Sequence, residues 1–124
     1  MSFELNVRAL TLVAAADFSA AQYKIAQVDS TGKAALANAT SLNVGVIQNN
    51  PGAAQPATVA VEGVSKVLLA GTVAAGARVT SDLNGLGIAA VTVGDSVVGV
   101  ALAGGVAGDL IPVLIGQYPF ATLA

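Results

Sequence analysis

Hydrophobic and polar residues alternate in short runs along most of this chain. At its start, Leu5, Val7 and Ala9 alternate with Asn6 and Arg8, which is the period expected of a half-buried β-strand. Comparable runs recur at the spacing of roughly 8–12 residues that is typical of β-sandwiches and β-barrels. They cover residues 22–25, 42–46, 57–62, 64–69, 78–81, 88–93, 97–102 and 110–115.

Turn-forming residues separate these runs. They are mostly Gly, Asn, Asp, Ser and Pro, and they gather at 29–32, 49–52 and 82–85. Gly94-Asp95 lies between two Val-containing runs and predicts a tight hairpin, while Gly63 predicts a bulge before Val64. Parallel strands need crossovers of a dozen or more residues, and most gaps here are shorter. We therefore predict an all-β, mainly antiparallel fold, a small single-domain barrel or sandwich with an extended N-terminal arm.

Two alanine-rich segments leave their local conformation open. Ala favours helix, so residues 68–77 and 34–39 are either short helices or further extended chain, and two glycines interrupt the first of them. Residues 73–76 and 106–108 are alike and each precede a β-branched run, but this likeness is too weak to predict an internal repeat.

The length of the chain allows one domain. With 124 residues and 12.0 kDa it can bury one modest core. We divide it into an N-terminal arm or first strand (1–13), a β domain (14–116) and a C-terminal tail (117–124).

The composition excludes several kinds of site and partner. Cys, His and Trp are absent, which removes disulfides, imidazole bases and Cys/His zinc sites. The few charges are scattered singly and sum to −2, so no nucleic-acid surface is expected. The mean hydropathy is +0.77, but charges or polar segments interrupt the apolar runs before the ~20 residues of a membrane span. The acidic start differs from a secretory signal, so we expect synthesis in the cytoplasm.

Charged residues make up only 10% of the chain, and hydrophobic residues make up 55%. Much of the hydrophobic fraction is Ala, which contributes little core per residue. A surface poor in charge favours association. We therefore infer that much of the exterior is covered by further copies of the chain or by another protein.

Three short motifs suggest chemistry but do not support it. Residues 85–90 match the dinucleotide fingerprint G-x-G-x-x-A, yet a strand-like run follows where that site needs a helix. Ser65 and Lys66 are adjacent on a predicted strand and point to opposite faces, so they cannot act as nucleophile and base. Residues 82–85 lack the full ligand set of a calcium loop. We predict no catalytic, cofactor-binding or metal-binding residue and no enzyme activity.

A succession of segments in this chain resembles the tailed-bacteriophage capsid decoration proteins, also called head cement or head-stabilising proteins. The segments are 14–19, 22–25, 28–33, 45–49, 57–67, 74–82, 85, 99–103 and 111–115. The chain departs from the family at Ala53-Ala54-Gln55-Pro56, where a Gly-Glu or Gly-Asp turn is expected, and in its longer tail at 117–120.

This resemblance implies a structural protein of the virion. Proteins of the family bind the outside of an icosahedral capsid, commonly as homotrimers, and fasten neighbouring capsid subunits against internal pressure. The implied partners are the major capsid protein and further copies of the chain, with no nucleic acid, membrane or cofactor. The implied location is the capsid exterior.

The two ends of the chain are candidate contacts with the capsid. Residues 2–13 could add a strand to a capsid sheet, and they could equally be the first strand of the domain's own sheet. The candidates in this arm are Ser2, Phe3, Leu5, Val7 and Ala9. In the tail, Pro119 blocks a central ladder position, so the tail lies at an edge, over a neighbour or on its own domain. Its candidate contacts are Tyr118, Pro119, Phe120 and Leu123.

Two other functions remain open from the residues. One is a structural subunit of another phage assembly, such as a tail or fibre component. The other is a small ligand-binding β-barrel, since barrels can enclose small molecules.

Overall fold

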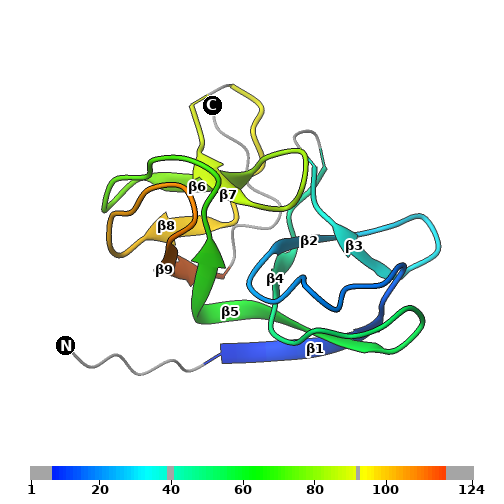
Figure 1. Cartoon of the computed structure of the whole chain (residues 1–124). Helices are drawn as coiled ribbons and strands as arrows, with labels where there is room; N and C mark the ends of the chain where they lie inside the picture. Colours follow the sequence, from blue (N-terminus) through cyan, green and yellow to red (C-terminus); the bar gives the residue numbers. More distant parts are fainter. Residues whose placement is uncertain (1–6, 39–40, 92, 117–124) are drawn as a thin grey trace.

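The computed structural model describes residues 7–38, 41–91 and 93–116. Within these ranges every regular element is a β-strand, and all ladders between strands are antiparallel (Figure 1). The strands are β1 (Val7–Val13), β2 (Ile25–Val28), β3 (Ala34–Leu36), β4 (Gly45–Ile47), β5 (Pro56–Leu68), β6 (Arg78–Ser81), β7 (Gly87–Ala89), β8 (Gly99–Ala101) and β9 (Leu110–Ile115). The predicted all-β, mainly antiparallel fold is confirmed. No helix of these ranges could span a membrane.

The sheet curls into a half-barrel around the long strand β5. Its order is β3-β2-β4-β5-β9-β8-β6-β7, and β1 pairs separately with β5. The first half of the 13-residue β5 pairs with β1 and β4, and its second half pairs with β9. The strand bends between these halves, where the register with β1 shifts opposite Val61 and Gly63 has a φ of 111°. The interruption predicted at Gly63 is thus a bulge and a bend within one continuous strand.

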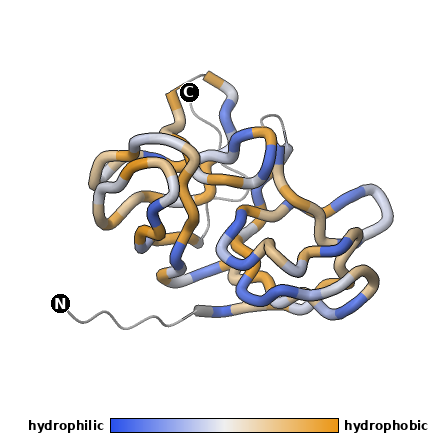
Figure 2. The backbone as a smooth tube through the Cα atoms, in the orientation of Figure 1, coloured by the Kyte–Doolittle hydropathy of each residue, from blue (hydrophilic) through white to orange (hydrophobic). Residues whose placement is uncertain are grey.

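The bend divides the sheet into two lobes (Figures 1 and 2). The first lobe contains β1 to β4 and residues 56–62 of β5, and the second contains residues 63–68 of β5 and β6 to β9. Hydrophobic residues are buried in both lobes. The core of the first lobe is Ala14, Phe18, Ala21, Ala26, Ala34, Ile47, Ala57 and Val59. The core of the second is Val67, Leu69, Val73, Val79, Val98, Ala101, Ile111, Val113 and Ile115, joined by four residues of the first lobe.

The second lobe repeats the strand pairing of the first. In the first lobe β2 pairs with β3 and β4, and β4 pairs with the first half of β5, which β1 also flanks. In the second lobe β6 pairs with β7 and β8, and β8 pairs with β9, which the second half of β5 also flanks. The chain is therefore an internal repeat of one five-strand unit, with β5 shared between the two copies.

Hydrogen bonds outside the strands repeat as well. The Asp29 and Asp82 carboxylates each accept backbone N–H groups two and four residues further on, which confirms both predicted turns. Three pairs of backbone N–H···O hydrogen bonds also match between the lobes. The Tyr23 bond to the Ile47 carbonyl matches the Gly76 bond to Ala101, and the Ala14 bond to Gln55 matches the Leu69 bond to Asp109. The Gln48 bond to Thr58 matches the Leu102 bond to Pro112. The sequence did not predict this repeat, because most matched positions carry different side chains.

The hairpin predicted at Gly94-Asp95 is wrong. Gly94 does have a positive φ of 96°, but β7 and β8 do not pair with each other. Each of them pairs with β6, so residues 90–98 connect the strands on its two edges. The run predicted as a strand over 88–93 ends at Ala89, and Val91 and Val93 are exposed.

The two alanine-rich segments contain no helix in the described residues. Residues 34–36 form β3, and residues 69–77 form a loop with isolated bridges at Leu69 and Val73. Both of these side chains are buried in the second core. Burial in the sheet therefore overrides the helix preference of Ala.

Candidate functional site

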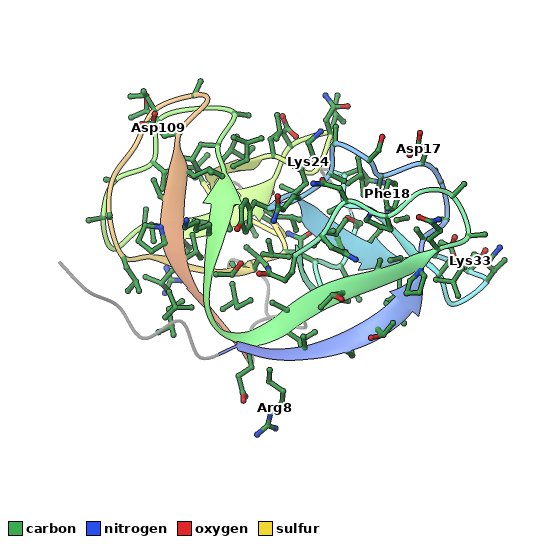
Figure 3. The ribbon with its side chains drawn as sticks, turned by 60° about the horizontal axis from the view of Figure 1, so that its bottom comes forward. Arg8, Asp17, Phe18, Lys24, Lys33 and Asp109 are labelled. Atoms are coloured by element: carbon green, nitrogen blue, oxygen red, sulfur yellow. The ribbon has the colours of Figure 1, made fainter. Side chains whose placement is uncertain are left out.

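The two described ends of the chain lie side by side at the bend of β5. Val7 at the start of β1 and Ile115 at the end of β9 both pair with Gly63. Figure 3 shows β1 and β9 along the outside of this bend. The remaining residues of the predicted arm and the predicted tail are therefore joined to the described chain at the same place.

One exposed ion pair marks this place on the surface. The Nε of Arg8 lies 3.6 Å from the Oε1 of Glu62, and both side chains are largely exposed. Arg8 points away from the sheet (Figure 3), and Gly116 lies against the Glu62 side chain. An exposed pair of this kind contributes little to stability, so both groups remain accessible to a partner.

The structure places only part of the predicted arm. Residues 7–13 form β1 and pair with β5 of the same chain, which is the alternative of a first strand in the domain's own sheet. Ala9 lies exposed on β1, and Val7 is described by its backbone pairing alone. The remaining predicted contacts lie outside the described residues: Ser2, Phe3, Leu5, Tyr118, Pro119, Phe120 and Leu123.

Strand β1 presents an open edge and apolar side chains. In the part of the chain that is described, β1 pairs with β5 and with no other strand. Leu10 and Val13 are exposed, while Leu12 packs on the first core. An unpaired strand edge readily accepts a further strand, so β1 offers main-chain and apolar contacts together.

A second set of exposed apolar side chains lies on the other lobe. Leu102 follows β8, and Leu110 and Leu114 belong to β9. All three are exposed. Exposed apolar side chains of this kind are candidate contacts with another protein or with a second copy of the chain.

The carboxylates of the described residues mostly organise turns. Asp29, Asp82 and Asp109 each accept backbone N–H groups of their own loops. The backbone N–H of Lys33 and the hydroxyl of Thr31 hold the pKa of the Asp29 carboxyl below its usual value of 3.8. Within residues 7–38, 41–91 and 93–116, no three acidic, His or Cys side chains gather as metal ligands would.

The short motifs that suggested chemistry have structural roles. Residues 85–90 form the end of a turn followed by β7, so no helix N-terminus is available to hold a phosphate. Ser65 is buried and accepts a hydrogen bond from Gln48, while Lys66 is exposed with its Nζ 5.9 Å from the Tyr23 ring centre. These two adjacent residues point to opposite faces, as predicted.

Sequence reasoning missed a buried polar group at the contact between the lobes. In the alternating run at 42–46 a half-buried strand would bury Leu42 and expose Asn43, but the structure exposes Leu42 and buries Asn43. Asn43 is fully buried and its backbone N–H donates to the Ser96 hydroxyl at 2.9 Å. Its side-chain Nδ2 donates to the Ser96 carbonyl at 2.8 Å and to Thr80 at 3.4 Å. The sequence signal for this buried group is the position of Asn43 between Leu42 and Val44, in a run of apolar residues.

Comparisons with known proteins give one fold likeness. No protein-family model and no curated protein sequence matches this chain. Among solved structures, the chain is similar to the N base of the head fibre gp8.5 of bacteriophage phi29, with a TM-score of 0.69 and 14% identity. The match covers 90% of this chain and 97% of that one. The likeness therefore shows that the two share a fold over nearly their whole lengths.

Proposed function

We propose that this chain is a structural protein of a tailed-bacteriophage virion that binds the outside of the capsid. The observation that carries this proposal is the fold likeness to the base of a phage head fibre, which covers nearly all of both chains. The sequence resemblance to capsid decoration proteins supports the same proposal independently.

Within this role, we propose a head-cement function. A homotrimer would bind several major capsid proteins and fasten them, with no catalysis, cofactor, nucleic acid or membrane. The meeting of the two described ends at the bend of β5 supports this, because segments joined to the chain at one place can contact neighbouring subunits together. Three such attachment points per oligomer would raise avidity about 10² to 10⁴-fold over one.

A fibre base is the second candidate, because the similar solved structure is described as one. The two functions differ in what binding does to the capsid. A cement protein links subunits and so raises the temperature at which a capsid opens. A fibre base needs only to attach to the capsid and need not change that temperature.

The test is co-sedimentation of the purified protein with expanded empty capsids of the phage that encodes it. We expect saturable binding by the full chain and loss of binding when residues 1–6 are deleted. That deletion leaves β1 in place, whereas a longer one would remove a strand of the sheet. Capsids that bind no full-length protein would overturn the proposal. Bound capsids whose thermal opening is unchanged would favour the fibre base over the cement.

A further inference from the structure

The contact between the two lobes joins different surfaces of the repeated unit. The Leu68 N–H donates to the Tyr23 carbonyl at 3.0 Å. The Gln48 amide donates to the Ser65 hydroxyl at 2.8 Å. The first lobe contributes what we call the receiving surface, and the second lobe contributes the inserting surface. We define the receiving surface by Tyr23, Ile25, Val46, Gln48 and Ala60, and the inserting surface by Ser65, Leu68 and Gly85. The hydrogen bonds of Asn43 with Ser96 and Thr80 also join the lobes but are not used in this definition.

This contact is head to tail rather than symmetric. The Ile25 N–H donates to the Gly85 carbonyl at 2.7 Å, and both residues are buried. In a symmetric contact the matched residues Arg78 and Gly32 would be covered in the same way, but both are exposed. Each lobe therefore carries one receiving and one inserting surface, and the contact within the chain uses one of each.

One inserting and one receiving surface remain free in the single chain. The register of the repeat identifies them. The free inserting surface in the first lobe is Leu10, Val13 and Gly32, and the free receiving surface in the second lobe is Gly76, Arg78, Val100, Leu102 and Leu114.

At three matched positions the free surfaces carry a leucine where the occupied contact carries a polar or small side chain, although the charged Arg78 takes the place of Ile25. Leu10 is 42% exposed, and its match Ser65 is 2% exposed. Leu114 is 41% exposed, and its match Ala60 is fully buried. Leu102, 40% exposed, takes the place of Gln48. The hydrogen-bonded pair of Gln48 and Ser65 thus has a leucine pair as its match on the free surfaces.

We propose that the free inserting surface of one chain docks on the free receiving surface of a second copy. The occupied contact inside the chain supplies the geometry, and it brings Leu10 of one copy against Leu102 of the next. A head-to-tail contact of this kind closes into a ring when its rotation fits a whole turn. The proposal rests on the oligomer of the proposed function and names the two surfaces that would form it, and a failed capsid experiment would leave it unaffected.

The test uses the purified full chain in solution, without capsids. Sedimentation velocity measures the mass of the wild type and of three variants, Leu10→Glu, Leu102→Glu and Val106→Glu. Val106 is exposed outside both surfaces, so its variant is the matched control. We expect an oligomeric wild type and control, and association weakened roughly 30-fold in each leucine variant, as for an interface hot spot. Circular dichroism checks that all variants are folded.

A mixture of the two leucine variants separates a head-to-tail contact from other oligomers. Each variant keeps one intact surface, so at a concentration where neither variant assembles alone the mixture forms one-to-one dimers. A monomeric wild type at several hundred micromolar would overturn the proposal. It would also be overturned if both variants assembled like the wild type, or if the mixture stayed monomeric while the wild type assembled.

Discussion

The two lobes share one plan of strands and turns but fill their interiors differently. Phe18 in the first core corresponds to Val73 in the second, and the smaller Ala14 corresponds to Leu69. Ile47 likewise corresponds to Ala101. The first lobe thus has the larger residue at Phe18 and the smaller one at Ala14, and the second lobe has the reverse at Val73 and Leu69. Cores tolerate such exchanges when the total volume is kept, so the backbone plan is conserved between lobes while the packing is not.

A few positions are the same in both lobes because the backbone leaves no alternative. Gly45 in β4 and Gly99 in β8 occupy matched places beside the next strand. A Cβ on either glycine would overlap a backbone carbonyl, of Ala60 for the first and of Leu114 for the second. The fold therefore requires the close approach of strands at these two glycines, whereas it tolerates different core side chains in the two lobes.

The largest predicted effect tests these two glycines. We expect Gly45→Ala and Gly99→Ala each to lower the free energy of unfolding by about 3 kcal/mol, because the neighbouring strand must move away. Urea denaturation followed by circular dichroism measures this. Gly71→Ala is the control, since its Cβ would meet only the Ile88 side chain at 3.9 Å. Equal stability of all three variants would refute the steric argument.

The second prediction concerns the exchange of large and small core residues. Phe18→Val gives the first lobe the residue of the second, and we expect it to lower the free energy of unfolding by about 2 kcal/mol through a cavity. Adding Ala14→Leu completes the exchange and should recover about 1 kcal/mol, although Ala14→Leu alone is destabilising by overpacking. The same denaturation assay measures all three. Strictly additive effects would show that the two positions do not compensate.

The sequence predicted the elements of this fold better than their pairing. Alternation and turn residues located most strands, because those signals act within a few residues. Strands β7 and β8 pair with the two edges of β6 rather than with each other. A pattern within a few residues of sequence cannot indicate which strand edge is free to pair. The hairpin at Gly94-Asp95 was wrong for that reason.

The site was less predictable than the fold. Alternation at 42–46 does not reveal that Asn43 is buried, because the rule assumes that only one face of a strand is buried. Asn43 lies between the two lobes, so its side of the strand becomes buried only when the second lobe packs against the first. The repeat itself was hidden, because it consists of matched hydrogen bonds rather than matched side chains.

A third, smaller effect comes from a turn that differs between the lobes. Ala54 has a φ of 63°, and its match Gly108 has a φ of 90°. The capsid decoration proteins suggested a Gly-Glu or Gly-Asp turn here, and the second lobe does have Gly108-Asp109. A left-handed conformation costs a residue with a Cβ roughly 1–2 kcal/mol, partly offset by the greater unfolded freedom of Gly.

We therefore expect Ala54→Gly to raise the free energy of unfolding by about 0.5 kcal/mol. Thermal and urea denaturation together resolve a change of this size. Ala53→Gly is the matched control in the same turn, because Ala53 has no positive φ, and it should lower stability. A loss of stability in both variants would show that the left-handed backbone at Ala54 is not strained.

The smallest predicted effect is the pH dependence of the first-lobe turn at Asp29. Its carboxylate accepts the backbone N–H groups of Thr31 and Lys33 and the Thr31 hydroxyl, and these bonds lower its pKa from 3.8. The unfolded chain then binds a proton at higher pH than the folded chain does. This contribution to stability is therefore present above pH 3.8 and is lost as the pH falls below it.

Asp29→Asn isolates that contribution, because the amide oxygen still accepts hydrogen bonds but no longer titrates. Urea denaturation between about pH 2.5 and about pH 6, which brackets an ordinary Asp pKa, should give a shallower loss of stability on acidification for the variant than for the wild type. Since Asp29 is partly exposed to solvent, salt screens the difference, so low ionic strength shows it best. Identical slopes for both proteins would mean that the turn forms equally well around a protonated carboxyl, and that its hydrogen bonds do not depend on the charge.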